Sequence, residues 1–153
     1  MLYGGQETER GHDRGSVSLY LAIFAIAAFA LLALLVDGGT AINAKERAAD
    51  IAEQAARAAV NQVDVGDLRS NNPTVVIGPG ACEAAANIVD RYPMTSHTTA
   101  RMTNCNAPVG ATTATVYVSV QTTPVFPAFF GSFTMTSHAS AKPVCGITQG
   151  GQC

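Results

Sequence analysis

Apolar residues are concentrated in one uninterrupted stretch near the N-terminus, from Val17 to Val36. The stretch has 20 residues without a charged side chain, and a helix of that length spans about 30 Å, the thickness of a bilayer's hydrocarbon core. A helix buried on every side needs a larger protein around it, and the apolar part of a cleaved signal peptide is shorter. The pattern therefore predicts a retained membrane-spanning helix, whose partner is the lipid bilayer.

A second helical pattern runs from Thr40 to Val63 and is rich in alanine, the best helix former. Small apolar residues recur in it at spacings of three and four and form one stripe: Ala41, Ala44, Ala48, Ile51, Ala55 and Ala59. Charged residues occupy the opposite face. Such a stripe packs against the protein's own sheet, its usual role, or against another subunit. Between the two helices, Gly38 and Gly39 form either a flexible joint or part of one continuous, bent helix.

The remaining chain is rich in threonine and serine and predicts short strands. Turn residues dominate 64–80, with room for a short strand over 74–77. A short helix is predicted over 81–92, where Pro93 stops it. An edge strand is predicted over 98–104, followed by two alternating strands over 113–121 and 132–141 that should pair antiparallel. We interpret the aromatic loop 124–131 as a seal for the sheet's core, with a partner-contact patch as the alternative.

The four cysteines all follow the apolar stretch: Cys82, Cys105, Cys145 and Cys153. They lack the close pairs of a zinc site, so we expect disulfides in an oxidising, extracytoplasmic compartment. Three pairings are conceivable. We prefer Cys82–Cys105 and Cys145–Cys153, because each closes a loop between neighbouring elements. Lysine and arginine are balanced around the span, so the cysteines decide the orientation, with the N-terminus cytoplasmic and the C-terminal domain outside the membrane.

These patterns together predict an α+β chain. A transmembrane helix continues into an amphipathic helix, and a small antiparallel β-sheet domain follows. The expected divisions are a cytoplasmic leader (1–15), the transmembrane helix and its exit (16–39), the alanine-rich helix (40–63) and an exported domain with disulfides (64–153).

Charge and composition argue against several functions. The formal net charge is −2 and no cluster of basic residues exists, so nucleic acid is not an expected partner. The three histidines lie far apart, and no nucleophile motif is present. We therefore expect no enzyme, no metal or cofactor site and no small-molecule substrate. An anchored secreted enzyme would need a pocket with convergent polar groups.

The segment from Asp13 to Ala59 resembles the N-terminal region of TadE/TadG-like pilus-assembly proteins. Its parts are an Arg14-Gly15-Ser16 start, the uncharged span, a Val36-Asp37-Gly38-Gly39 exit and an alanine-rich helix ending over 50–59. The strand pair that ends TSHASAKP is also similar. The resemblance implies a single-pass, pilin-like protein of the cell membrane that serves a tight-adherence (Tad-type) pilus or secretion machine, with other pilus subunits as partners.

The chain departs from processed pilins at one position. Those proteins carry a glutamate five residues after the glycine at which the leader is cut, and counting from Gly15 this position holds Tyr20. Gly15 and Ser16 therefore mark a leader-cleavage position whose use is open. The missing acid favours an anchored, TadG-like minor component over a subunit of the filament shaft. The alternative hypothesis is a signal-anchored surface binding module unrelated to pili.

Overall fold

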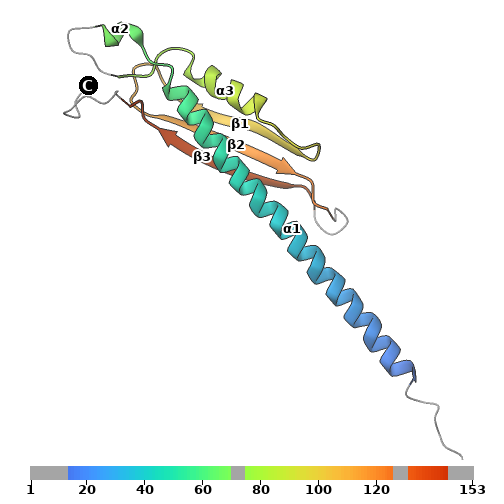
Figure 1. Ribbon diagram of the computed structural model, residues 1–153. Coiled ribbons are helices and arrows are strands. Elements are labelled where there is room, and N and C mark those ends of the chain that lie inside the picture. Colours follow the sequence, from blue (N-terminus) through green and yellow to red (C-terminus); the bar gives the residue numbers. More distant parts are fainter. Residues whose placement is uncertain (1–13, 70–74, 126–130, 145–153) are drawn as a thin grey trace, which may run out of the picture. The chain divides into compact units, whose positions relative to one another are not determined.

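The computed structural model describes residues 14–69, 75–125 and 131–144. Two compact units make up the chain, an N-terminal unit, Met1–Val36, and a C-terminal unit, Asp37–Cys153. The described elements are α1 (Arg14–Val60), α2 (Val65–Leu68), α3 (Ala81–Arg91), β1 (Thr98–Asn106), β2 (Ala114–Thr122) and β3 (Phe133–Ala141) (Figure 1). The predicted α+β class, with a long apolar helix followed by a small antiparallel sheet, is confirmed.

Helix α1 has 47 residues and includes both the apolar stretch and the alanine-rich segment. The helix is assigned through Gly38 and Gly39, so of the two alternatives the continuous helix is the one observed. Each helical glycine costs about 1 kcal/mol relative to alanine. A Cβ at either position would meet no atom within 4 Å, so no packing in the described residues requires these glycines.

The three strands form one antiparallel sheet in the order β1-β2-β3. The last two predicted strands pair as expected, with Tyr117 opposite His138 and Val118 opposite Ser137. Strand β1 lies at an edge of the sheet, and its register with β2 shifts between Met102 and Asn104. Burial alternates strictly along the central strand β2. Its even-numbered residues are buried, and its odd-numbered residues face away from the helices.

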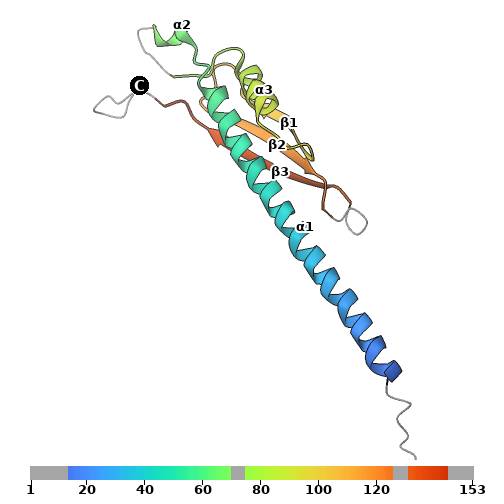
Figure 2. The ribbon, with the colours of Figure 1, turned by 45° about the vertical axis from the view of Figure 1, so that its right-hand side comes forward.

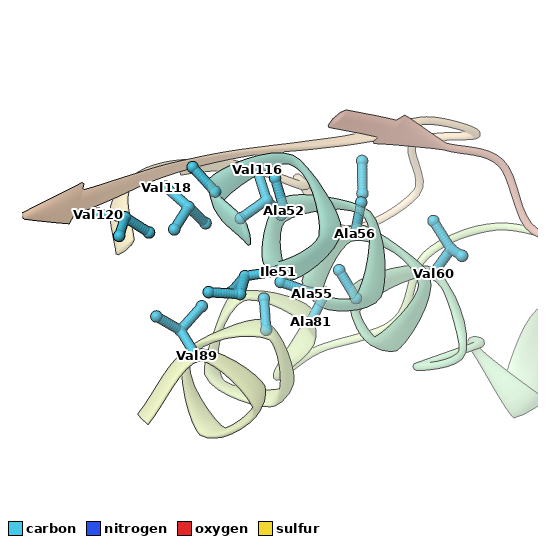
Figure 3. Close-up of a cluster of buried hydrophobic side chains, with 14 of the residues drawn as sticks. Ile51, Ala52, Ala55, Ala56, Val60, Ala81, Val89, Val116, Val118 and Val120 are labelled. Carbon is cyan, nitrogen blue, oxygen red and sulfur yellow. The ribbon is translucent and has the colours of Figure 1, made fainter. Parts of the chain in front are cut away.

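The core lies between the sheet and two helices that cover the same face of it, α3 and the C-terminal part of α1 (Figure 2). Fully buried valines of β2, Val116, Val118 and Val120, point from the sheet toward α1. Ile51 lies between α1 and α3, where Val89 closes the cluster from the other side (Figure 3). Burial of each such aliphatic side chain contributes about 1.5–3 kcal/mol.

The face of α1 in this core consists almost entirely of alanine. Ala48, Ala52, Ala55 and Ala59 are fully buried. Because an alanine side chain is a single methyl group, the helix backbone can pack closely against the valines of β2 and the facing side of α3. Burying an alanine also costs no side-chain entropy. The helix thus contributes the small half of the core and β2 the large half.

Helix α3 is held to the sheet by a covalent bond as well as by packing. Cys82 in its first turn forms a disulfide with Cys105 of β1, at a sequence separation of 23. Closing a loop of that length stabilises a fold by about 3 kcal/mol in the chain-entropy account. The residue before the helix, Gly80, has a φ of +84°, a left-handed conformation that glycine adopts without strain.

The connection between α1 and α3 differs from its prediction. Of the short strand predicted over 74–77, residue 74 lies outside the described residues, and over 75–77 the structure has an isolated bridge of Ile77 with Val63 in place of a strand. Helix α2 is an element that the sequence patterns do not predict. The Asp64 side chain caps α2 by accepting from the Gly66 amide. Gly78 passes so close to Val63 that a Cβ would lie 3.0 Å from its carbonyl carbon. Backbone contacts rather than a sequence pattern define this segment.

Overpacking should test the close approach of α1. We expect Ala55→Leu to lower the free energy of unfolding by about 1–3 kcal/mol, because the added methylenes have no space in the core beside α3. Leucine is nearly as good a helix former as alanine, so propensity does not explain such a loss. Urea unfolding of the full chain in detergent, followed by circular dichroism, measures it. The neighbouring exposed position provides the control, since Gln54→Leu should change stability by less than about 0.5 kcal/mol.

Candidate membrane-anchoring and assembly site

The N-terminal part of α1 presents apolar side chains in all directions. Large residues throughout Val17–Val36 are exposed, among them Phe24, Ile26, Phe29 and Leu35. Among the described residues one helix is long and apolar enough to cross a membrane, and its most apolar window is only 6% buried. A surface of this kind is unfavourable in water and suits hydrocarbon. This surface suggests a membrane anchor by length and composition.

Asp37 is the first residue after this surface, and it is buried. Its side chain is only 1% exposed. Its Oδ1 accepts a hydrogen bond from the Val125 backbone amide at 2.8 Å, across 88 residues of sequence. Its Oδ2 is also buried, and within the described ranges it has no hydrogen-bond partner. The carboxylate therefore ties the segment after β2 to the start of the C-terminal unit.

Asp37 belongs to the same face of α1 as the core. Counting forward by four, three and four leads to Ala41, Ala44 and Ala48, of which the last two are buried. In the same turn the Thr40 hydroxyl donates to the Asp37 carbonyl oxygen at 2.7 Å. The packing stripe identified in the sequence thus extends one turn further back than the alanines. In the sequence, Asp37 stands at a position where the spacing of the stripe would place an apolar residue. That spacing alone does not identify Val125 as its hydrogen-bond partner.

The predicted packing stripe lies inside its own unit. Five of its members, Ala44, Ala48, Ile51, Ala55 and Ala59, belong to the core formed with β2 and α3, and Ala41 is half-buried. The structure thus places the stripe against the protein's own sheet. The side chains that α1 leaves exposed beyond the apolar stretch are polar or charged, apart from Ile42.

Lys45 of α1 reaches the outer edge of the sheet. Its Nζ donates to the backbone carbonyl oxygen of Thr136 in β3. A free edge strand is a template for pairing with another chain, and a lysine on that edge is a common protection against it. The sequence does not predict this contact, because 91 residues separate the two partners.

The other predicted site residues are distributed as follows. Cys82 and Cys105 form the preferred disulfide, whereas Cys145 and Cys153 lie outside the described residues. Gly15 and Ser16 lie in the first turn of α1. The three phenylalanines of the aromatic loop, Phe126, Phe129 and Phe130, also lie outside the described residues. Across the described part of the chain no three His, Cys, Asp or Glu side chains are grouped to hold a metal ion.

Residues 15–62 match a family model described as "Putative Flp pilus-assembly TadE/G-like". This segment is TadE/TadG-like. The match coincides with α1, which ends at Val60, and it confirms the resemblance that the Arg-Gly-Ser start, apolar span and alanine-rich helix indicate. No curated protein matches the chain, and no solved structure matches it. The TadE/TadG-like segment therefore covers the apolar stretch, Asp37 and the face of α1 that packs in the core, whereas α3 and the sheet lie beyond it.

The role of the Asp37 contact is testable by a pair of substitutions. We expect Asp37→Ala to cost about 1–3 kcal/mol of unfolding free energy, because the Val125 amide loses its acceptor. Asp37→Asn keeps an acceptor oxygen and removes a buried charge, so it should cost less than about 1 kcal/mol. Urea unfolding measures both, and hydrogen exchange at the Val125 amide reports the bond itself. Equal stability of the two variants would contradict this role for the hydrogen bond.

Proposed function

We propose that this protein is a membrane-anchored, minor-pilin-like component that assists assembly of a Tad-type pilus or secretion machine. The observation that carries the proposal is the coincidence of the family match over 15–62 with a single helix. That helix combines an apolar, exposed half with a half that packs in a folded domain. The protein has no catalytic part in this role and acts through assembly.

The anchoring half of the proposal has a sufficient driving force. The span contains twelve Val, Leu, Ile and Phe residues, and each contributes about −0.3 to −0.6 kcal/mol to insertion. Together they favour insertion by about 4–7 kcal/mol. Asp37 follows immediately, and its burial with the Val125 amide keeps that charge off the lipid-facing surface. The exposed charged side chains of α1 beyond it, such as Glu46 and Asp50, support a position of the rest of the helix outside the bilayer.

The Cys82–Cys105 disulfide supports an extracytoplasmic C-terminal unit. Disulfides persist in oxidising compartments and are rare in the cytosol. A single span with that unit outside puts the N-terminal leader in the cytoplasm. In this orientation the sheet domain faces the space in which a pilus is assembled, and its partners there are other pilus-assembly or pilin subunits.

Two lysines in the span should detach the protein from the membrane. A lysine near the centre of a membrane helix costs about 2.5–3.5 kcal/mol, so Phe24→Lys with Phe29→Lys costs about 5–7 kcal/mol, enough to cancel the insertion energy. We expect the double variant to leave the membrane fraction after alkaline extraction. Ile42→Lys, at an exposed apolar position beyond the span, should remain membrane-bound. Retention of the double variant would contradict the assignment of 17–36 as the anchor.

Deletion of the gene tests the assembly role. We expect the deletion to reduce the number or length of pili on the cell surface, counted by electron microscopy, and the wild-type gene to restore them. The Phe24→Lys, Phe29→Lys gene should fail to restore them, whereas the Ile42→Lys gene should succeed. Unchanged pili in the deletion strain would exclude the proposal and favour a surface binding module that is unrelated to pili.

A further inference from the structure

The sheet has a second face, opposite the helices, on which the described side chains are polar or aromatic. The register of the strands puts two rows side by side on this open face. In one row Asn104, Tyr117 and His138 lie on β1, β2 and β3; in the next, Arg101, Ser119 and Thr136 do. At the usual spacings these rows cover about 10 Å across the strands and 7 Å along them.

An aromatic pair marks the centre of this open face. The rings of Tyr117 and His138 stack, with their centroids 5.2 Å apart and their planes at 24°. Both side chains are exposed, although aromatic rings more often serve a core or an interface. Stacking fixes the rings in place, so a ligand that rests on them need not order them first. The neighbouring rows supply hydroxyl and amide groups, which both donate and accept hydrogen bonds.

Charge is segregated between the two sides of the C-terminal unit. Residues 37–90, which include the helices of this unit, contain eight acidic and four basic residues, a formal charge of −4. No aspartate or glutamate follows Asp90 in the sequence, so the strands contain none. The open face therefore has no acidic side chain among its described residues, and it presents the exposed guanidinium of Arg101 one row from the aromatic pair. An anionic ligand meets a cation here and no like charge.

We propose that the open face of the sheet binds an anionic polysaccharide. A uronic acid unit has an apolar face of C–H groups for the aromatic pair, hydroxyls for the Ser, Thr and Asn side chains, and a carboxylate for Arg101. Arg–carboxylate hydrogen bonds are charge-assisted and directional. Sheet faces of small β domains bind oligosaccharides in other folds. This activity is separate from anchoring and assembly, since it uses neither α1 nor Asp37.

Nucleic acid fits the same face less well. Its binding draws on many phosphate contacts and several stacked bases, whereas the described strands supply one formal cation and one aromatic pair on this face. Hydroxyl and amide groups are in the majority there, which matches a ligand rich in hydroxyls.

The test uses the full chain in nanodiscs of a zwitterionic lipid. Three immobilised probes are compared at low salt: polygalacturonate, uncharged dextran, and oligothymidylate. We expect retention on polygalacturonate alone, weakened by added salt. Arg101→Gln should reduce the affinity at least about tenfold, the loss of one charge-assisted hydrogen bond. The matched control is Arg57→Gln, an exposed cation on α1, which should change the affinity less than about twofold.

A second variant addresses the aromatic pair. Tyr117→Thr keeps a good strand former at that position and removes the stack, and it should also weaken retention. If Tyr117→Thr does not fold, Arg101→Gln still tests the proposal, because Arg101 is exposed and its substitution should leave the fold intact. The proposal is overturned if the wild type does not bind polygalacturonate, if dextran binds equally, if oligothymidylate binds more tightly, or if both arginine variants lose affinity equally. None of these outcomes changes the pilus counts expected of the deletion strain.

Discussion

Close packing of one alanine-lined helix face against the valines of β2 is the contact on which the C-terminal unit depends. A unit with one three-stranded sheet and two covering helices buries little apolar surface, so each buried methyl group matters. Alanine allows the α1 backbone to approach both β2 and α3, and Ile51 fills the space between the helices. The disulfide between Cys82 and Cys105 then secures α3, the smaller of the two covering helices.

The sequence patterns predict the elements that depend on local periodicity. Uniform apolarity from 17 to 36 and the alternation of β2 require no knowledge of distant residues, and the helix and the strand that they predict are both observed. The sequence does not decide between a flexible joint and a continuous helix at Gly38 and Gly39, because two glycines weaken a helix without forbidding it. The prediction for 74–77 failed where backbone bonds decide the structure. Gly110 and Ala111 in the β1–β2 connection exchange hydrogen bonds with Ile77, and such pairing has no local signature.

The site was predictable only in part, for the same reason. The apolar helix and the packing stripe follow from composition and spacing. The Asp37–Val125 and Lys45–Thr136 contacts each join residues about 90 positions apart, and no alternation or helical period relates such pairs. The open face of the sheet was predictable in one respect and not in another. Its polar character is visible in the alternation of β2. The position of Arg101 in the row next to Tyr117 depends on the bulge in β1, which has no sequence pattern.

The 88-residue separation between Asp37 and Val125 has a consequence for biogenesis. Helix α1 precedes the sheet in the chain, and it can form before the sheet is synthesised because helices need only local contacts. The carboxylate of Asp37 can accept its hydrogen bond only after Val125, which follows β2, has been synthesised. Until then Asp37 depends on water for its solvation. Folding of the segment after β2 then replaces water at this carboxylate with the Val125 amide, so the first turn of the C-terminal unit is completed by one of the last segments to be made.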